Sequence, residues 1–323
     1  MRLVIRSRYA RMIPDMSTSK CVYLKIMIKG LKAIQSFDLD MSITSSAKPN
    51  ANGNLFEVRT VQSAAFRTLI EGLKEILAEA NLEFDQTGIR IIDVDETHTV
   101  LTYLRLNADK FEYFYCPAKF ILGVNMMYLF KLIKTLSNND SLTLFLPASN
   151  PNKLGIRAEN AEKQTTNTWM MKLFDTNVEN IELPNIQFTS IITMPSSDFQ
   201  KICRDFNALA EKLEITSSNS DLIFRCIGDF VDGETVILSE SQGGVRVQKT
   251  TSAGASTTEI VQGIFELKYL VMFTKCTNLC PTIEIYLKND YPLVLRYMVA
   301  NLGEVRVVLA PQKQKTDGVK KAV

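Results

Sequence analysis

The sequence predicts an α+β fold of two similar domains, each with an antiparallel sheet that carries helices on one face. Three observations lead to this prediction. The chain has 323 residues, 46% of them hydrophobic, which is enough for about two domains. The halves that begin at Leu55 and Gln187 repeat one order of strands and helices. Strands follow each other through short polar turns, which is typical of antiparallel pairing with helices layered on one side.

The first half opens with an alternating strand from Leu55, and a helix of about four turns follows Ser63. A strand restarts at residues 82–84. A second helix is predicted over residues 124–136, and the alternating residues 141–147 predict the strand after it.

The second half repeats this order from Gln187. Ser196 or Ser197 is the expected N-cap of its first helix, and Asp198 falls in the first turn. The elements predicted after that helix are a strand at 213–215, a helix over 267–276 and a strand over 282–288.

The closing strand, residues 303–309, runs into Pro311, which cannot donate a hydrogen bond to a neighbouring strand. An apolar Leu-Ala-Pro end beside a basic tail indicates that another molecule docks there. Residues 173–189 are acidic and contain Pro184, so they predict an extended connector. The expected divisions are a basic N-terminal extension (1–54), a first domain (55–172), the connector (173–189), a second domain (190–311) and a basic tail (312–323).

The net charge of +2 hides an uneven distribution. Residues 1–54 carry a net charge of +6 and residues 312–323 a net charge of +3, so the body between them carries −7. Simple DNA-binding domains are normally basic throughout, and the body of this chain is acidic, so it does not resemble such a domain. If the protein handles DNA, its positive charge must gather on one surface.

Each predicted helix offers a basic pair within this acidic body. The pairs are Arg67 and Lys74, Lys131 and Lys134, Lys201 and Arg204, and Lys268 and Lys275. Any single pair is better explained by a solvated helix face, and Glu71 lies near the first pair, but four such pairs within an acidic body favour a binding surface. No aromatic residues interleave with these cations, so contact with the phosphate backbone without sequence readout is the expected chemistry.

The sequence does not favour an enzyme, a metal site or a cofactor. Carboxylates cluster in "DVDE" (93–96) and "GDFVDGE" (228–234), but neither has the spacing of a calcium loop. The chain has six cysteines and one histidine, a poor basis for zinc, so reduced and mostly buried thiols are expected. No apolar run approaches the roughly 20 residues of a membrane span, and no secretory signal is predicted.

Five long motifs occur in order along the chain. They are "GVNMMYLFKLIK" (123–134), "MKLFDTNVENIELP" (171–184), "MPSSDFQKICRDF" (194–206), "ELKYLVMFTKCT" (266–277) and "YPLVLRYMVANLGEVRVVLAP" (291–311). With them the chain closely resembles the proliferating cell nuclear antigen family of DNA sliding clamps, from Leu55 to Pro311.

The resemblance implies that three subunits join head to tail in a closed ring, with sheets outside and helices lining a hole. The basic helix pairs would face duplex DNA, which the ring encircles without reading its sequence. It also implies a polymerase processivity factor for replication and repair, opened by a clamp loader ATPase. Such a protein is expected in a nucleus or a viral replication compartment, as an intracellular protein that is neither secreted nor bound to a membrane.

The resemblance further implies a hydrophobic groove for DNA polymerase and other proteins with a PCNA-interacting motif. The matching positions are His98, Leu101, Ile181, Leu183, Pro292, Leu309, Ala310 and Pro311. Without the resemblance, His98 is explained as an ordinary turn residue.

In the family, an edge strand of one subunit pairs with an edge strand of the next. The matching segments here are 168–173 and 235–239. The expected contact residues at this seam are Trp169, Met171, Phe206, Val236 and Leu238.

Three departures set this chain apart from the family pattern. Residues 1–54 have no counterpart, and they are a basic arm, a targeting segment or upstream sequence before a start such as Met41. Asn219 stands where the family has a lysine that is modified, and the tail is basic rather than acidic. These departures suit a viral or protist clamp. The alternatives are a subunit of a heterotrimeric or checkpoint-type clamp, and a processivity factor that forms no ring.

Overall fold

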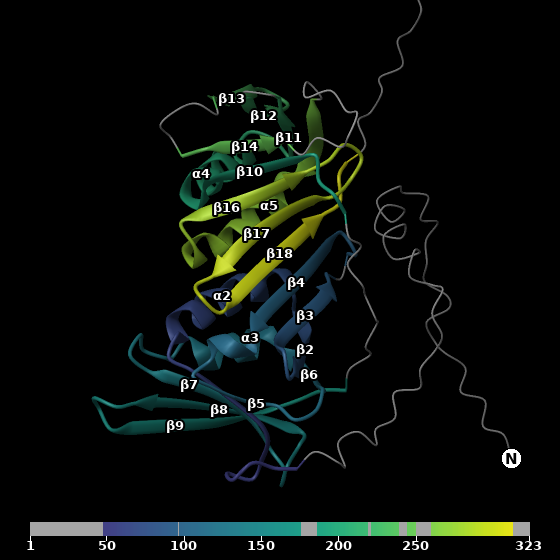
Figure 1. Ribbon diagram of the computed structural model, residues 1–323. Coiled ribbons are helices and arrows are strands. Elements are labelled where there is room, and N and C mark those ends of the chain that lie inside the picture. Colours follow the sequence, from purple (N-terminus) through teal and green to yellow (C-terminus); the bar gives the residue numbers. More distant parts are fainter. Residues whose placement is uncertain are drawn as a thin grey trace, which may run out of the picture.

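The computed structural model (Figure 1) describes residues 48–95, 97–175, 186–218, 221–238, 244–249 and 260–312. The predicted α+β fold of two similar domains with antiparallel sheets is confirmed. In the described part of the chain, no helix has both the length and the apolar character needed to cross a membrane.

Among the described residues, the first half contains nine strands, two α-helices and one short 3-10 helix. They are β1 (Asn54–Thr60), α2 (Ser63–Ile76), β2 (Glu79–Asp85), β3 (Gly88–Val94), β4 (Val100–Asn107), η2 (Ala108–Lys110), β5 (Tyr113–Tyr115), β6 (Phe120–Asn125), α3 (Met126–Ile133), β7 (Ser141–Pro147), β8 (Lys153–Asn160) and β9 (Thr165–Lys172).

The second half repeats the order of strands and α-helices. Its elements are β10 (Ser190–Pro195), α4 (Ser196–Asn207), β11 (Lys212–Ser217), β12 (Asp221–Ile227), β13 (Asp232–Leu238), β14 (Arg246–Lys249), β15 (Val261–Glu266), α5 (Leu267–Phe273), η3 (Thr274–Leu279), β16 (Thr282–Leu287), β17 (Leu293–Val299) and β18 (Gly303–Leu309).

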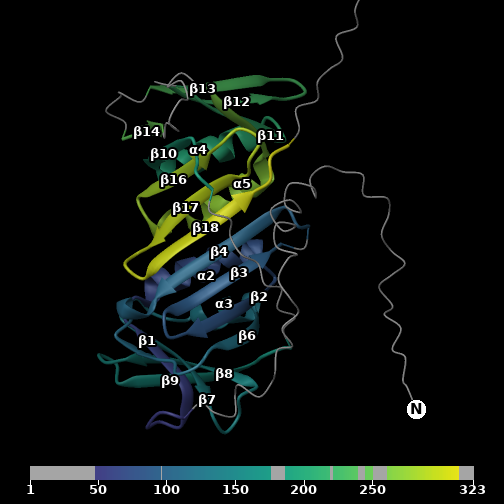
Figure 2. The ribbon, with the colours of Figure 1, turned by 45° about the vertical axis from the view of Figure 1, so that its right-hand side comes forward.

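The sheets follow the same repeat. In the first half, β5-β1-β7-β8-β9 form a sheet, and the corresponding order in the second half is β14-β10-β16-β17-β18. The strands β6-β2-β3-β4 likewise correspond to β15-β11-β12-β13. The halves are joined where β18 pairs antiparallel with β4, from Gly303 opposite Leu106 to Leu309 opposite Val100. This pairing makes one nine-stranded sheet that runs through both halves (Figure 2).

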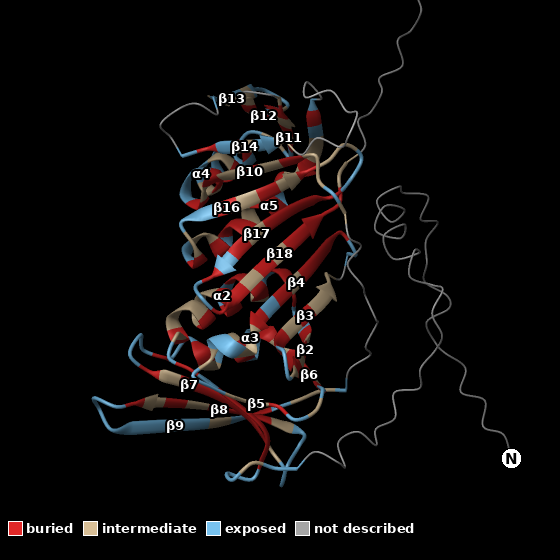
Figure 3. Ribbon diagram, in the orientation of Figure 1, coloured by how far each residue is buried: buried red, intermediate tan, exposed pale blue. Residues whose placement is uncertain are grey.

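The helices lie together on one face of the nine-stranded sheet (Figures 1 and 2). α2 packs against α3 and α5, and α4 packs against α5. The core lies between the helices and the sheets, and buried residues are concentrated on strands such as β17 and β18 (Figure 3). Phe56 and Phe84 stack in this core with ring centroids 4.4 Å apart. Four of the described cysteines are buried, as expected: Cys116, Cys203, Cys226 and Cys276.

Two helices are shorter than predicted. α3 begins only at Met126, because the side chain of Asn125 caps it by accepting a hydrogen bond from the Tyr128 N–H at 3.1 Å. α5 ends at Phe273 and continues as the 3-10 helix η3. Apolar periodicity does not separate these tighter turns from an α-helix.

The expected serine N-cap of α4 is wrong. Pro195 holds the cap position, Ser196 is the first helical residue, and no side chain caps this helix. The reason is that β10 runs directly into α4, and the Ser196 N–H instead donates to the Pro281 carbonyl at 2.9 Å. Asp198 lies in the first turn, as predicted.

Residues 48–54, which belong to the predicted N-terminal extension, are folded onto the first domain. The side-chain amides of Asn50, Asn52 and Asn54 all donate to one oxygen of Glu57, at 2.8, 2.9 and 2.8 Å. The Tyr115 hydroxyl donates to the Lys48 carbonyl at 2.7 Å. The rest of the extension, Asn219 and the tail beyond Gln312 lie outside the described residues.

Candidate nucleic-acid and partner interfaces

Six of the eight predicted channel cations are exposed on the helix layer. They are Lys131, Lys134, Lys201, Arg204, Lys268 and Lys275. They come from both halves of the chain, and Lys275 lies on η3 directly after α5. The helix layer therefore presents the concentrated positive charge that the acidic body requires if the protein is to contact phosphates.

The other two cations, both on α2, are engaged inside the protein. The Arg67 guanidinium donates to the Leu136 carbonyl at 2.7 Å and to Oδ1 of Asn138 at 2.8 Å. The Lys74 side chain is only 12% exposed, because it pairs with Glu75 and its Nζ lies 4.8 Å from the centre of the Phe130 ring. These contacts tie α2 to α3 and the loop after it, so the role of both residues toward DNA stays a prediction.

Aromatic residues do accompany the cations, contrary to the expectation from sequence: Phe130 lies beside Lys74, Tyr269 beside Lys268 and Tyr128 beside Lys131. Tyr128 on α3 is 61% exposed, and Nζ of Lys131 lies 4.8 Å from its ring centre. The sequence signal was available, since Tyr128 and Lys131 are three residues apart and share a helix face.

An apolar row crosses the domain joint on the sheet face opposite the helices. Tyr286, Val294, Val308, Leu101 and Val94 are direct cross-strand neighbours from β16 to β3. Leu101, Val294 and Val308 form a cluster that is separate from the main core. We call these five residues the outer row. Leu101, Val294 and Val308 are at most 9% exposed, and a role of the row in binding a partner stays a prediction.

Two aromatic or aliphatic side chains flank the outer row. Phe188, just before β10, packs against it, with its ring 5.4 Å from that of Tyr286 in an edge-to-face arrangement. Ile92 packs on the same cluster from β3. A charged row, Glu284, Arg296 and Arg306, runs parallel to the apolar one. The patch is thus apolar at its centre and charged at one side, which is typical of protein interfaces.

Some of the predicted groove residues lie in or beside the outer row, and others point into the core. Leu101 belongs to it, and Pro292 is buried beside β17. Leu309 and Ala310 are 1% and 2% exposed, and Leu309 belongs to the main core, so its side chain faces the helices. The outward residue of the chain end is Val308, because successive strand residues point to opposite faces.

His98 lies in an exposed turn at the edge of the patch, with a φ of 51° and its N–H donating to the Asp95 carbonyl at 2.9 Å. Pro311 is half-buried. The chain end is held against this turn, because the Ala310 N–H donates to the Thr99 carbonyl at 3.3 Å. Ile181 and Leu183 lie outside the described residues.

The two predicted seam segments are edge strands. Among the described strands, β9 pairs only with β8 and β13 pairs only with β12. Trp169 is half-buried and Met171 is 8% exposed on β9, whereas Val236 and Leu238 on β13 are 47% and 57% exposed. Phe206 is buried beneath β13, where a Cβ on Gly233 would lie 2.7 Å from its ring.

Two domain models of one family match this chain. The N-terminal domain of proliferating cell nuclear antigen matches residues 55–180, and the C-terminal domain matches residues 182–312. The chain belongs to the proliferating cell nuclear antigen family. It is also 33% identical over 261 residues to a probable DNA polymerase sliding clamp of Paramecium bursaria Chlorella virus 1, which covers 80% of this chain and 97% of that relative.

As a member of this family, the protein is a DNA sliding clamp and a scaffold rather than an enzyme. Two of the carboxylates that suggested an enzyme, Asp95 and Glu234, have structural partners in the clamp. Oδ1 of Asp95 accepts the Thr99 and Val100 N–H groups at 2.8 and 2.7 Å and builds the turn that carries His98. Glu234 pairs with Arg225 across β12 and β13.

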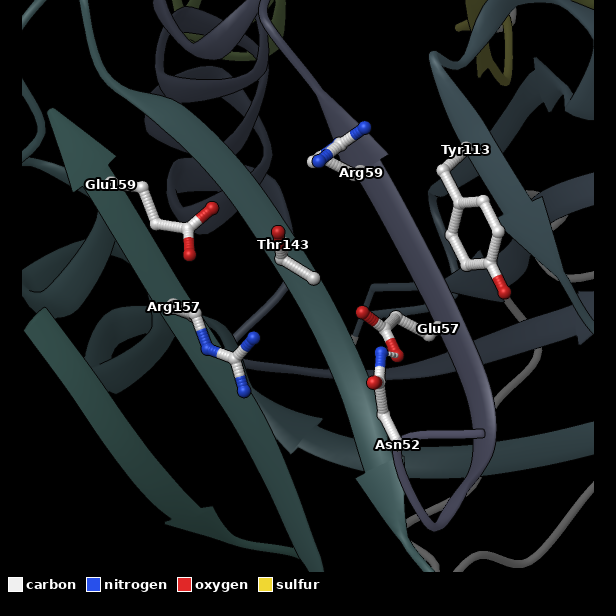
Figure 4. A pocket seen from close by; sticks show the side chains of 7 residues that line it. All are labelled: Asn52, Glu57, Arg59, Tyr113, Thr143, Arg157 and Glu159. Atoms are coloured by element: carbon white, nitrogen blue, oxygen red, sulfur yellow. Dashed lines mark hydrogen bonds between the residues drawn. The ribbon is translucent and has the colours of Figure 1, made fainter. Parts of the chain in front are cut away.

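A polar hollow of about 310 Å³ lies on the outer face of the first domain of the clamp (Figure 4). Seven residues line it: Asn52, Glu57, Arg59, Tyr113, Thr143, Arg157 and Glu159. Burial alone would raise the pKa of the Glu57 carboxyl, but the three asparagine amides and the charge of Arg157 hold that pKa below its usual value. With two arginines and two glutamates, the hollow has no net charge to select an ion, and Asn52 of the turn 48–54 lines one side of it.

Proposed function

We propose that three copies of this clamp join head to tail into a ring that encircles duplex DNA and tethers DNA polymerase and other replication and repair proteins. The observation that carries the proposal is the joint between the domains. Within one chain, β18 of the second half pairs with β4 of the first. The strands that occupy these positions in the internal repeat are β9 and β13, which are the edge strands.

Pairing β9 of one subunit with β13 of the next would therefore repeat the joint that the chain already makes. It would satisfy two exposed strand edges at once. It would also cover Val236, Leu238 and the half-buried Trp169, which otherwise leave apolar surface at both edges. Because these two edges differ, the contact is heterologous, and such a contact forms a closed ring when its repeated rotation completes one full turn.

The helix layer supports the DNA part of the proposal. Its six exposed cations suit phosphates and have no arrangement for reading bases. Individual contacts of this kind exchange readily, so the ring would slide along the duplex. Dissociation would then require the ring to open, for which a clamp loader ATPase is the expected partner. A nucleus or a viral replication compartment is the proposed location.

Absolute mass by light scattering over a dilution series tests the ring. We expect a species of three times the chain mass of 36.4 kDa. Val236→Arg should convert it to monomer, because a buried unpaired charge at the seam is strongly unfavourable. Val61→Arg is the matched control, since Val61 is also exposed and lies away from both edge strands. A wild-type monomer at every concentration would reject the ring and favour a heterotrimeric or ring-less factor.

The partner site is tested separately with Val94→Glu in the outer row. We expect this change to abolish stimulation of DNA polymerase on primed circular DNA while the trimer mass stays unchanged, because a charge in the row opposes docking of apolar side chains. Val94 suits this test better than Leu309, whose side chain is in the core. Full stimulation by the Val94→Glu ring would place the partner site elsewhere.

A further inference from the structure

The two halves of the chain carry a tyrosine at the same place in their repeat, but its surroundings differ. Tyr269 is the third residue of α5, which follows β15, and Tyr128 is the third residue of α3, which follows β6. In each case the Nζ of a lysine lies over the ring, 4.7 Å from its centre in α5 and 4.8 Å in α3. Tyr269 is 7% exposed, whereas Tyr128 is 61% exposed. One of the two tyrosines is therefore covered within the chain, and the other is left open.

The joint between the domains explains why Tyr269 is covered. Its hydroxyl group and that of Thr97 lie 3.1 Å apart and share a hydrogen bond. Thr97 belongs to the turn between β3 and β4, and β4 is the strand that pairs with β18 at the joint. The helix α2 of the first half also packs against α5 of the second. The joint thus combines two paired strands with a tyrosine that contacts the turn leading into the paired strand.

The turn between β12 and β13 occupies the corresponding place at the free edge. In the repeat, β12 and β13 correspond to β3 and β4. Three apolar residues in this turn and beside it are exposed: Ile227 by 76%, Phe230 by 98% and Val231 by 51%. The Gly228 N–H closes the turn by donating to the Val231 carbonyl at 3.1 Å. An apolar turn therefore leads directly into the edge strand β13.

A fourth exposed apolar residue, Leu209, adjoins this turn. A Cβ on Gly228 would lie 2.3 Å from the Leu209 carbonyl oxygen, so the turn packs against the chain there. Leu209 is 44% exposed, while its counterpart Ile76 in the first half is 7% exposed. The two correspond because each is thirteen positions after the first residue of its helix, Ser196 in α4 and Ser63 in α2. We call Leu209, Ile227, Phe230 and Val231 the turn patch.

We propose that Tyr128 of one copy of this chain docks on the turn patch of the next copy, with Phe230 as its main contact. This inference rests on the proposed ring. Pairing β9 with β13 repeats the joint between β18 and β4, and the same repeat puts α3 in the place of α5. The β12–β13 turn then takes the place of the turn that contacts Tyr269. Because β9 and β13 lie at opposite ends of the molecule (Figures 1 and 2), each copy offers its tyrosine to one neighbour and its turn patch to the other.

The chemistry of both surfaces suits this contact. Tyrosine and phenylalanine rings attract each other beyond the gain from their buried area, and covering the turn patch removes exposed apolar surface. The charges are complementary as well. Residues 120–139 around α3 include Lys131 and Lys134 and no acidic residue, whereas residues 226–233 include the exposed Asp229 and Asp232 and no basic residue. Side-chain burial at the helix layer would thus add to the backbone hydrogen bonds of the paired strands.

The first test measures dissociation of the ring formed by the full-length chain, from its mass over a dilution series. Tyr128→Ala should weaken association about tenfold at each seam, the range expected for a lost aromatic contact. The concentration at which half of the ring dissociates should then rise roughly thirtyfold, because three weakened seams enter one equilibrium. Tyr113→Ala is the matched control and should dissociate like wild type. Tyr113 is 39% exposed on β5, at the far edge of the sheet that ends in β9.

The outcomes of this test separate the contact from the ring. A Tyr128→Ala ring that dissociates at the wild-type concentration would reject the contact and leave the ring standing. A wild-type chain that is monomeric at every concentration would reject the ring, and the contact with it.

The second test asks whether Tyr128 and Phe230 meet each other. Phe230→Ala should also weaken association about tenfold at each seam. Combining it with Tyr128→Ala should add little further weakening, because either change alone already removes the contact between the two rings. If instead the two fold-changes multiply in the double variant, the residues act independently and the proposed pair is overturned.

Discussion

The helices α2 and α4 occupy the same place in the two domains, yet they use their polar residues differently. Arg67 and Gln200 are each the fifth residue of their helix. Arg67 donates to the Leu136 carbonyl just beyond α3, and Gln200 donates to the Thr274 carbonyl at the end of α5, at 3.0 Å. Both satisfy a carbonyl that a helix end leaves without a partner.

The fifth residue of each helix therefore forms a tie, meaning a hydrogen bond that connects the helix to the end of its neighbour. The charge of Arg67 is not needed for this bond, since the uncharged Gln200 makes the same one. The solvent-exposed faces of the two helices differ in charge. The positions of Lys201 and Arg204 on α4 are occupied by Thr68 and Glu71 on α2. Of these two helices with similar counts of basic residues, only α4 therefore presents its basic pair to solvent. Spacing along a helix shows which residues share a face, but not whether that face meets solvent.

The largest effect should come from breaking the tie in α2. Arg67→Ala removes both hydrogen bonds and leaves the Leu136 carbonyl without its donor, so unfolding in urea should show a loss of about 2 kcal/mol. Arg67→Gln should restore much of this loss, because glutamine makes the corresponding bond in α4. Arg204→Ala should change stability little, since Arg204 is 71% exposed. Equal losses for Arg67→Ala and Arg204→Ala would refute the assignment.

A smaller effect should distinguish the two helices in DNA binding. Removing Lys201 and Arg204 together should reduce the slope of log Kd against log salt concentration by about two, close to one per phosphate contact. Arg67→Gln should leave the slope unchanged, because its guanidinium is already engaged. Titration of a linear duplex at several salt concentrations measures both. If Arg67→Gln alone reduces the slope by about one, α2 also faces the DNA.

The comparison also shows what the sequence could predict. Alternation and helical periodicity are local, so the repeated strands and helices were predictable from short windows. The partners of Arg67 lie 69 and 71 residues further along the chain, which no local pattern reveals. The chain end posed a different problem. Val307, Val308 and Leu309 are all apolar, so alternation predicts a strand without telling which residue faces the core and which faces the partner site.

The smallest effect concerns the asparagine turn on Glu57, which among the described residues occurs in the first domain. Because the pKa of Glu57 is lowered in the folded protein from its usual 4.5, its contribution to stability is complete above that value and is lost as the pH falls through the folded pKa. Glu57→Gln should therefore flatten the acid side of the stability curve, measured by urea unfolding at a series of pH values, and leave the neutral side with a small uniform loss. Glu214→Gln in the second domain is the control, because Glu214 shows only a distant pairing with Arg225 at 4.0 Å. An equal flattening by both changes would mean that the turn adds nothing specific to the first domain.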